Sequence, residues 1–317
     1  MPTEEERSNN IKKISIITGL SIGLLGIVLG GYYIATQVYD TGSEVGSAVQ
    51  QYSPELQQTE SNSALDLLAK LRDKGGEDWP PEENVVGVTS PKFPDDLAEV
   101  SVKERKELFF RILTPIILAE NARLRALRGM LQDFAKRADS LTGSEEQKLA
   151  YLAQRYRVQR DSDSFFADLL RRVDEVPIDL AIAQAANESG WGTSRFTSQA
   201  NNLFGEWTWT QEEGLIPKHR AEGKTHRIRV FDSLQGSVRS YFYTLNVGNA
   251  YADFRDKREE LRAKGLSVKG YDMATTLISY SERGKEYVEE IRSMISYNNL
   301  NELNGLKLQA VDGKEHN

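Results

Sequence analysis

The longest apolar stretch of the chain lies near its start. Residues 14–39 contain no charged side chain, and a helix of about 20 apolar residues is long enough to cross the hydrocarbon layer of a membrane. The alternatives are a buried core helix and a cleaved signal peptide, whose apolar region is usually shorter, about 7–15 residues. Basic residues precede the stretch, and acidic residues follow it from Asp40 onward. This asymmetry predicts a cytoplasmic N-terminus (1–13) and a single-pass transmembrane signal anchor (14–38) in the inner membrane. The rest of the chain is then expected in the periplasm or outside the cell.

The next segment, residues 39–100, is polar and interrupted by prolines. Helical periodicity of apolar residues is visible only over 65–71. This composition predicts a linker or stalk between the anchor and a folded domain, with the option that it clasps that domain.

From Ser101 onward, apolar residues recur at helical spacing. Residues 101–163 are expected to form accessory helices, and the first covers 102–136, with Pro115 at a kink or boundary. The capping-box form Ser144-Glu-Glu-Gln147 is expected to begin another helix. A further apolar stripe predicts a helix over 165–173.

The next predicted helix carries the main candidate for chemistry. Pro177 stands where helices often begin, and apolar residues recur from Ile178 at i, i+4 and i+7. Gly190 is a natural left-handed cap. Glu188 therefore falls in the last turn, at the edge of the buried stripe and close in direction to Ala181.

The rest of the chain predicts a small β component and more helices. Alternating residues over 207–210 and 225–231 predict two short strands, and Ser233 is expected to cap a helix. Further helices and a flexible tail are expected over these residues: 250–264, 271–280, 285–297 and 301–317. The predicted fold class is mainly α (α+β), with one β-hairpin inserted after the Glu188 helix.

Composition excludes several classes of function. The net charge of −7 and the pI near 5.3 argue against a nucleic-acid partner. Without cysteine there is no disulfide, thiolate catalysis or cysteine-ligated zinc. The three histidines form no HExxH pattern and accompany no GxSxG elbow, so neither a metal site nor a serine triad is expected. No cofactor is predicted.

The sequence predicts surroundings for Glu188 that suit a catalytic acid. The C-terminal end of a helix carries partial negative charge, and burial beside Ala181, Ala185 and Trp191 disfavours a carboxylate further, so the pKa should rise. Protonation of a glycosidic oxygen requires such a neutral carboxyl group. The glycines on either side of Trp191 would permit a tight turn and the close approach of a flat ligand. The alternative is that Glu188 is simply solvated, as most glutamates in a last helical turn are.

Three separated motifs resemble one family. The sequence AQAANESGWGTSRF (183–196), the segment NLFG (202–205) and the later YSERGKEY (280–287) resemble the bacterial glucosaminidase domain of glycoside hydrolase family 73. The similarity is closest to its Bax-like branch and covers roughly 164–300. The anchor and the linker lie outside it.

The resemblance implies a lysozyme-like fold for residues 164–300 and an endo-β-N-acetylglucosaminidase-like activity on the β-1,4 bonds of peptidoglycan. It implies that Glu188 is the general acid, that Tyr287 is the active-site tyrosine, and that Asn202 and Phe204 form the cleft and bind substrate. Tyr280 is assigned to substrate binding too, although it is one residue farther from Tyr287 than in the family form Tyr-Ala-Thr-Asp-Pro-x-Tyr.

A second carboxylate is harder to assign. Glycoside hydrolysis usually needs a base or nucleophile about 5–9.5 Å from the acid, and the family often takes it from the β insertion. The candidates are Glu206, Glu212, Glu213 and Glu222. We favour Glu222, with Glu213 next. The alternative is that all four are surface charges and that the N-acetyl group of the sugar supplies the nucleophile.

Aromatic side chains of the domain are candidates for stacking on sugars. Trp191 is expected to serve both the core and the substrate. Trp207 and Trp209 would share one face of a strand, where carbohydrate contact and hairpin packing are equally plausible.

Three polar side chains of the second predicted strand complete the candidates. His226 is expected to be a packed, hydrogen-bonded histidine. Arg227 and Arg229 should face the other way as solvated charges, or meet carboxylates of the peptide stem.

The leading hypothesis is a membrane-anchored peptidoglycan hydrolase with Glu188 as proton donor. Its partners would be the glycan strands and, through the N-terminal helix, the inner membrane. The alternatives are a lytic transglycosylase, in which Glu188 acts first as acid and then as base, and a non-catalytic glycan-binding or scaffold protein.

Overall fold

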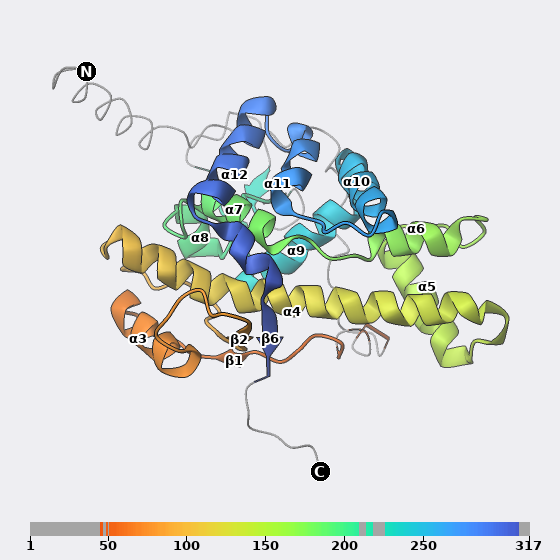
Figure 1. Ribbon diagram of the computed structural model, residues 1–317, viewed down its shortest axis with the longest axis horizontal. Coiled ribbons are helices and arrows are strands. Elements are labelled where there is room, and N and C mark those ends of the chain that lie inside the picture. Colours follow the sequence, from red (N-terminus) through yellow and green to blue (C-terminus); the bar gives the residue numbers. More distant parts are fainter. Residues whose placement is uncertain (1–44, 47–48, 50, 209–213, 218–225, 311–317) are drawn as a thin grey trace, which may run out of the picture.

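A single long helix, α4 (Val102–Lys136), runs through the computed structural model, and the other elements pack on both of its sides (Figure 1). The structure describes residues 45–46, 49, 51–208, 214–217 and 226–310. Ser101 begins α4 in a reciprocal capping box with Glu104. The predicted range 102–136 is confirmed, and Pro115 lies inside the helix and not at a boundary.

The remaining helices lie on two sides of α4. On one side lies α3 (Ala64–Gly75), and most later helices lie on the other (Figure 1). Later helices and 3-10 turns follow in this order: η1 (Ala138–Ser140), α5 (Gly143–Arg155), α6 (Phe165–Arg172), α7 (Ile178–Ser189), α8 (Arg195–Ala200), α9 (Leu234–Val247), η2 (Asn249–Tyr251), α10 (Ala252–Ala263), α11 (Gly270–Met273), η3 (Ala274–Thr276), η4 (Ile278–Tyr280), α12 (Lys285–Tyr297) and η5 (Leu300–Gly305). The prediction of a mainly α protein is confirmed.

Two details of the helix prediction are wrong. The capping box that begins α5 is formed by Thr142 and Glu145, not by Ser144, because the Glu145 carboxylate accepts from the Thr142 backbone N–H (2.8 Å). The expected helix over 271–280 is split into α11, η3 and η4. The hydroxyl of Thr276 donates to the Met273 carbonyl (2.7 Å), an interaction that competes with regular helix bonding.

Of the two options for the polar segment 39–100, its described part agrees with the one in which it clasps the domain, because its apolar residues join the core. Leu67, Leu68 and Leu71 of α3 are buried together with core residues of α4. Asp96 accepts a hydrogen bond from the first backbone N–H of α3, that of Ala64 (2.7 Å). The described residues 51–100 therefore pack on the domain as a folded layer. The sequence did not predict this layer, because its apolar residues are few and widely spaced.

Short strand pairs connect distant parts of the chain. β1 (Gln57–Gln58) pairs in parallel with β3 (Val88–Thr89), and β2 (Asn84–Val86) pairs in parallel with β6 (Lys307–Gln309). The expected flexible tail is thus ordered over 301–310, and its Leu303 and Leu306 are buried.

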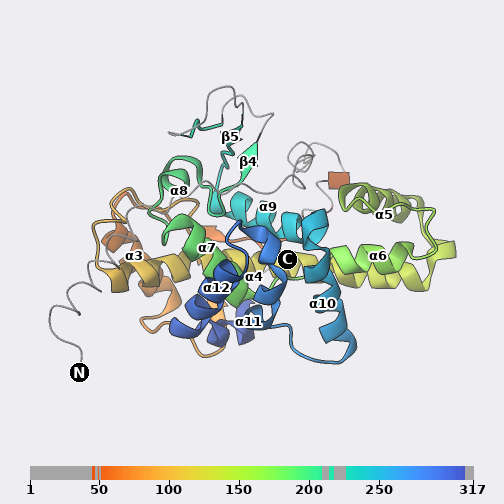
Figure 2. The ribbon, with the colours of Figure 1, turned by 90° about the horizontal axis from the view of Figure 1, so that it is seen from above.

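The predicted β insertion is present but short. β4 (Trp207–Thr208) pairs antiparallel with β5 (Arg227–Ile228), with Trp207 opposite Ile228. Figure 2 shows this pair projecting from the helices beside α8 and α9. The six-residue helix α8, capped by Ser194, was not predicted because it is too short to show a period.

The predicted signal anchor, 14–38, lies outside the described residues. Within the part that the structure describes, no helix combines the length and the apolar character that a membrane crossing requires.

The packing of α3 predicts a difference between two of its leucines. Leu67→Ala should lower the free energy of unfolding by about 2–5 kcal/mol, since it leaves a cavity in the core, whereas Leu65, which is 52% exposed, should tolerate alanine within about 0.5 kcal/mol. Urea denaturation of the full chain measures both. Equal, small effects would mean that this segment is a loose linker after all.

Candidate active site

Helix α7 presents Glu188 from an almost fully buried scaffold. Residues 178–186 of α7 are all buried. The helix ends at Gly190, which is left-handed (φ 57°, ψ 47°) and donates its N–H to the Ala186 carbonyl, as predicted. Asn187 and Glu188 therefore lie in the last turn, only partly covered, on a helix whose orientation is fixed by packing.

Three consecutive residues after Glu188 adopt positive φ. They are Gly190 (57°), Trp191 (60°) and Gly192 (84°). A tryptophan in this conformation is unusual, and the Trp191 ring is held edge-on against Phe109 and Phe110 of α4, at centroid distances of 5.4 and 5.7 Å. The expected tight turn is present.

The expected approach of a flat ligand to this turn does not occur at Gly192. A Cβ on this residue would lie 2.9 Å from Leu97 and 3.0 Å from Phe93. The space that this glycine provides is therefore occupied by the layer formed by residues 51–100, which explains the need for glycine without a ligand.

The Glu188 carboxyl group is withdrawn from solvent. Burial raises its pKa to about 7, and hydrogen bonding from Tyr287 and Asn187 and the charge of Arg283 only partly oppose this. One carboxyl oxygen, Oε1, is buried without a protein partner. A substantial fraction of Glu188 is therefore protonated near neutral pH, and one of its oxygens is without a protein partner.

A hydrogen-bonded chain of side chains lies behind Glu188. Tyr241 of α9 donates to Gln184 Oε1 (2.5 Å), and Gln184 Nε2 donates to the Tyr287 hydroxyl oxygen (2.8 Å). The Tyr287 hydroxyl is thus left with its proton directed to Glu188. Gln184 and Tyr241 were missed from the sequence, although Gln184 is a polar residue four positions before Glu188 on the same helix face.

The tyrosines form a buried stack. Tyr280 lies parallel to Tyr287 (centroids 5.3 Å apart, 13° between planes), and Tyr251 follows at 6.1 Å from Tyr280. All three rings are buried. Tyr280, which was expected to bind substrate, therefore supports the ring of Tyr287 from behind.

Asn202 and Phe204 shape the site from inside. The Asn202 amide donates to the carbonyls of Glu206 and Arg229 (both 2.9 Å) and accepts from the Glu206 N–H (2.9 Å). Phe204 stacks on Tyr241 at 3.9 Å. Both side chains are buried, so they hold the loop against α9 and are not exposed to a ligand.

The hairpin candidates are only partly within the described residues. Trp207 is partly exposed and packs edge-on against His226 at 4.4 Å, which agrees with the packed histidine that was expected. Arg229 is not a solvated charge: it forms a salt bridge with Glu206 (3.3 Å). The other hairpin candidates, Trp209, Glu212, Glu213 and Glu222, lie outside the described residues.

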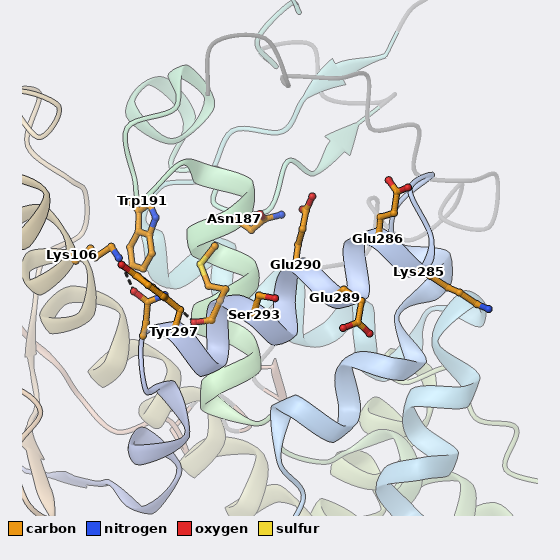
Figure 3. Close-up of a pocket in the computed structure, with 11 residues that line it drawn as sticks. Lys106, Asn187, Trp191, Lys285, Glu286, Glu289, Glu290, Ser293 and Tyr297 are labelled. Atoms are coloured by element: carbon orange, nitrogen blue, oxygen red, sulfur yellow. Dashed lines mark hydrogen bonds between the residues drawn. The ribbon is translucent and has the colours of Figure 1, made fainter. Parts of the chain in front are cut away.

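A groove of about 910 Å³ opens at the end of α7 (Figure 3), and Glu188 is not among the residues that line it. It lies between α4, the end of α7 and the outer face of α12. Asn187 and Trp191, which flank Glu188 and Ser189 in the sequence, line it, and Lys106 sits at one end with its ammonium 4.6 Å from the Trp191 ring. Tyr297, 84% exposed, lines the same end. The size and the mixture of aromatic and polar groups suit a sugar chain.

Comparison with known proteins agrees with the geometry. Residues 164–300 match the family model described as mannosyl-glycoprotein endo-beta-N-acetylglucosaminidase. The chain is also 32% identical over 212 residues to the Protein bax of Escherichia coli (strain K12), covering 66% of this chain and 75% of that protein. This similarity is longer than the family match, so it includes residues outside 164–300. No solved structure matches the chain.

The raised pKa of Glu188 predicts a pH-dependent cost to stability. A carboxyl that titrates near 4.5 when unfolded and near 7 when folded stabilises the fold below pH 4.5, and this contribution is lost as pH rises to about 7. Glu188→Gln cannot ionise, so above pH 7 it should be more stable than the wild type by up to about 3 kcal/mol. Chemical denaturation at several pH values measures the difference.

The exposed Glu302→Gln variant is the control and should show no such trend. Parallel curves for the wild type and Glu188→Gln would contradict the raised pKa.

Proposed function

Because the chain belongs to the Bax-like glucosaminidase-domain proteins, we propose that it is a peptidoglycan hydrolase that cleaves β-1,4 bonds of N-acetylglucosamine. Glu188 is its general acid, on a domain of lysozyme-like fold. One observation carries this proposal: burial at the end of helix α7 raises the pKa of Glu188 to about 7, and the preceding residue, Asn187, lines a groove.

The surrounding side chains suit proton donation. Near neutral pH a substantial fraction of Glu188 carries a proton that can pass to the oxygen of the glycosidic bond as it leaves C1. The carboxylate that remains is stabilised by the Tyr287 hydroxyl and by Asn187. Gln184 and Tyr241 keep that hydroxyl oriented. Tyr287 therefore acts through Glu188, as a positioning residue.

The groove supports binding of a glycan strand. Trp191 and Tyr297 offer aromatic surface, while Asn187 and Asn298 offer amide groups, the combination that recognises sugar rings and their hydroxyl and acetamido groups. Trp207 adds an aromatic side chain on the hairpin side. The sugar at the scissile bond would then lie between the groove and the hairpin.

We place the protein in the inner membrane, with its C-terminal domain on the outer side. The support is the uncharged stretch 14–39 with basic residues before it. This arrangement would keep the hydrolase close to the cell wall and restrict cleavage to wall material near the membrane.

The membrane proposal predicts how the full chain fractionates. The full chain should stay in the membrane pellet during alkaline carbonate extraction, because an apolar helix of this length partitions into lipid. A variant lacking residues 1–38 should be released. Release of the full chain would contradict the anchor.

The catalytic proposal predicts a loss of activity in Glu188→Gln. The variant should fold and melt no lower than the wild type, but clearing of purified cell walls in a zymogram should fall at least about 100-fold, since the proton donor is gone. Glu302→Gln is the matched control. Unchanged clearing by Glu188→Gln would refute the assignment.

Mass spectrometry of the digest distinguishes the alternatives. Reducing N-acetylglucosamine ends support the hydrolase, whereas 1,6-anhydromuramic ends mean a lytic transglycosylase. Binding of N-acetylglucosamine oligomers with no turnover by the wild type would mean a glycan-binding or scaffold protein.

A further inference from the structure

Two carboxylates in the described part of the chain share an uncommon feature. Glu188 and Glu206 each have one buried oxygen, Oε1, with no protein hydrogen-bond partner, and no other Asp or Glu among the described residues does. A buried acceptor without a partner is costly and requires an explanation. For Glu188 the explanation is proton donation to a ligand. For Glu206 Oε1, the contacts described above supply no explanation.

Glu206 is held firmly by its other oxygen. Oε2 accepts from the Ser240 hydroxyl (2.7 Å) and from Arg229 (3.3 Å), while Arg229 also donates to Ser240 (2.8 Å). The backbone of Glu206 is fixed by the Asn202 amide through both its N–H and its carbonyl. The carboxylate is therefore fixed in one orientation, with Oε1 left over.

Glu206 and Glu188 lie around the same group of tyrosines. Burial raises the pKa of Tyr251 and of Tyr280, and the negative charges of Glu188 and Glu206 both add to this. Helix α9 connects them: Ser240 donates to Glu206, and the next residue, Tyr241, is hydrogen-bonded through Gln184 and Tyr287 to Glu188. The two carboxylates thus act on the same tyrosines, Glu188 from the end of α7 and Glu206 from the loop before β4.

The chemistry of Glu206 suits a base. Burial raises its pKa, so its carboxylate accepts a proton more readily than an exposed glutamate does. Arg229 and Ser240 oppose this shift, and their hydrogen bonds favour the ionised form. Glu188 has no cation within hydrogen-bonding distance among its described partners. These different surroundings favour Glu206 as the base and Glu188 as the acid.

We propose that Glu206, and not a glutamate of the hairpin beyond β4, is the second catalytic carboxylate of the site. This role rests on the proposed function. In the step, the water oxygen forms a bond to C1 of the sugar while the bond from C1 to the glycosidic oxygen breaks. Glu188 gives its proton to the leaving oxygen, and Glu206 Oε1 takes a proton from the water. Passing that proton back to Glu188, directly or through solvent, completes the cycle.

The test compares three glutamine variants in cell-wall clearing. Glu206→Gln keeps the size of the side chain and an oxygen for Ser240 and Arg229, so the thermal midpoint should stay within a few degrees. Its rate should fall about 100-fold or more. Glu213→Gln and Glu222→Gln test the two rival assignments and should retain clearing. The exposed Glu302→Gln is the control and should stay within about threefold of the wild type.

A second variant separates catalysis from structure. Glu206→Ala leaves space for a small anion, so sodium azide or formate should restore part of the lost activity, and azide should yield a glycosyl azide product. The same anions should not rescue Glu188→Gln. A residue with a purely structural role would show no rescue.

Either of two results would overturn the role of Glu206. One is a Glu206→Gln variant that keeps wild-type clearing while Glu222→Gln or Glu213→Gln loses it. The other is loss in Glu206→Gln accompanied by a lowered thermal midpoint and no anion rescue in Glu206→Ala. Absence of clearing by the wild type is distinguishable from both, since it refutes the proposed function itself.

Discussion

The burial of one carboxyl group at the end of α7 is the constraint that organises this structure. Removing Glu188 from water disfavours its ionised form, and the protein accepts that cost because α7 is enclosed by α4, α11, α12 and η5. In the proposed function, the proton that burial retains on Glu188 is the one that passes to the glycosidic oxygen. Hydrogen bonds from Tyr287 and Asn187 reduce the cost of ionising Glu188. Its pKa therefore lies near 7, where the protonated and ionised forms coexist at neutral pH.

The turn after Glu188 depends on parts of the chain that precede the glucosaminidase match. Phe93 and Leu97 fill the space at Gly192, and Phe109 and Phe110 hold the Trp191 ring in its strained position. The layer of residues 51–100 and the long helix α4 are therefore structural supports of the site. The similarity to the bacterial relative is longer than the family match, which fits a unit larger than residues 164–300.

The site has two sides with different surroundings. On the α12 side, Glu188 is hydrogen-bonded to a tyrosine hydroxyl, and its neighbour Asn187 lines an open groove. On the α9 side, Glu206 is fixed by a guanidinium and a hydroxyl. The buried rings of Tyr280 and Tyr287 stack on each other, and Tyr287 is hydrogen-bonded to Glu188. Burial raises the pKa of both glutamates, but only Glu206 has a guanidinium and a serine hydroxyl that favour its ionised form through hydrogen bonds.

The sequence alone determined the local features: the range of α4, the range of α12 and the left-handed end of α7 at Gly190 follow from apolar spacing and cap residues. Its motifs also indicated the family and the position of Glu188. Only the tertiary structure decided what surrounds that residue. Tyr241 and Gln184, Gln184 and Tyr287, and Arg229 and Glu206 are joined across 57, 103 and 23 positions of the chain. Such pairs cannot be predicted from local periodicity. The spacing of apolar residues indicates which face of a helix is buried, but not which residues pack against that face. For the same reason the layer of residues 51–100 looked like a linker until its few leucines were seen against α4.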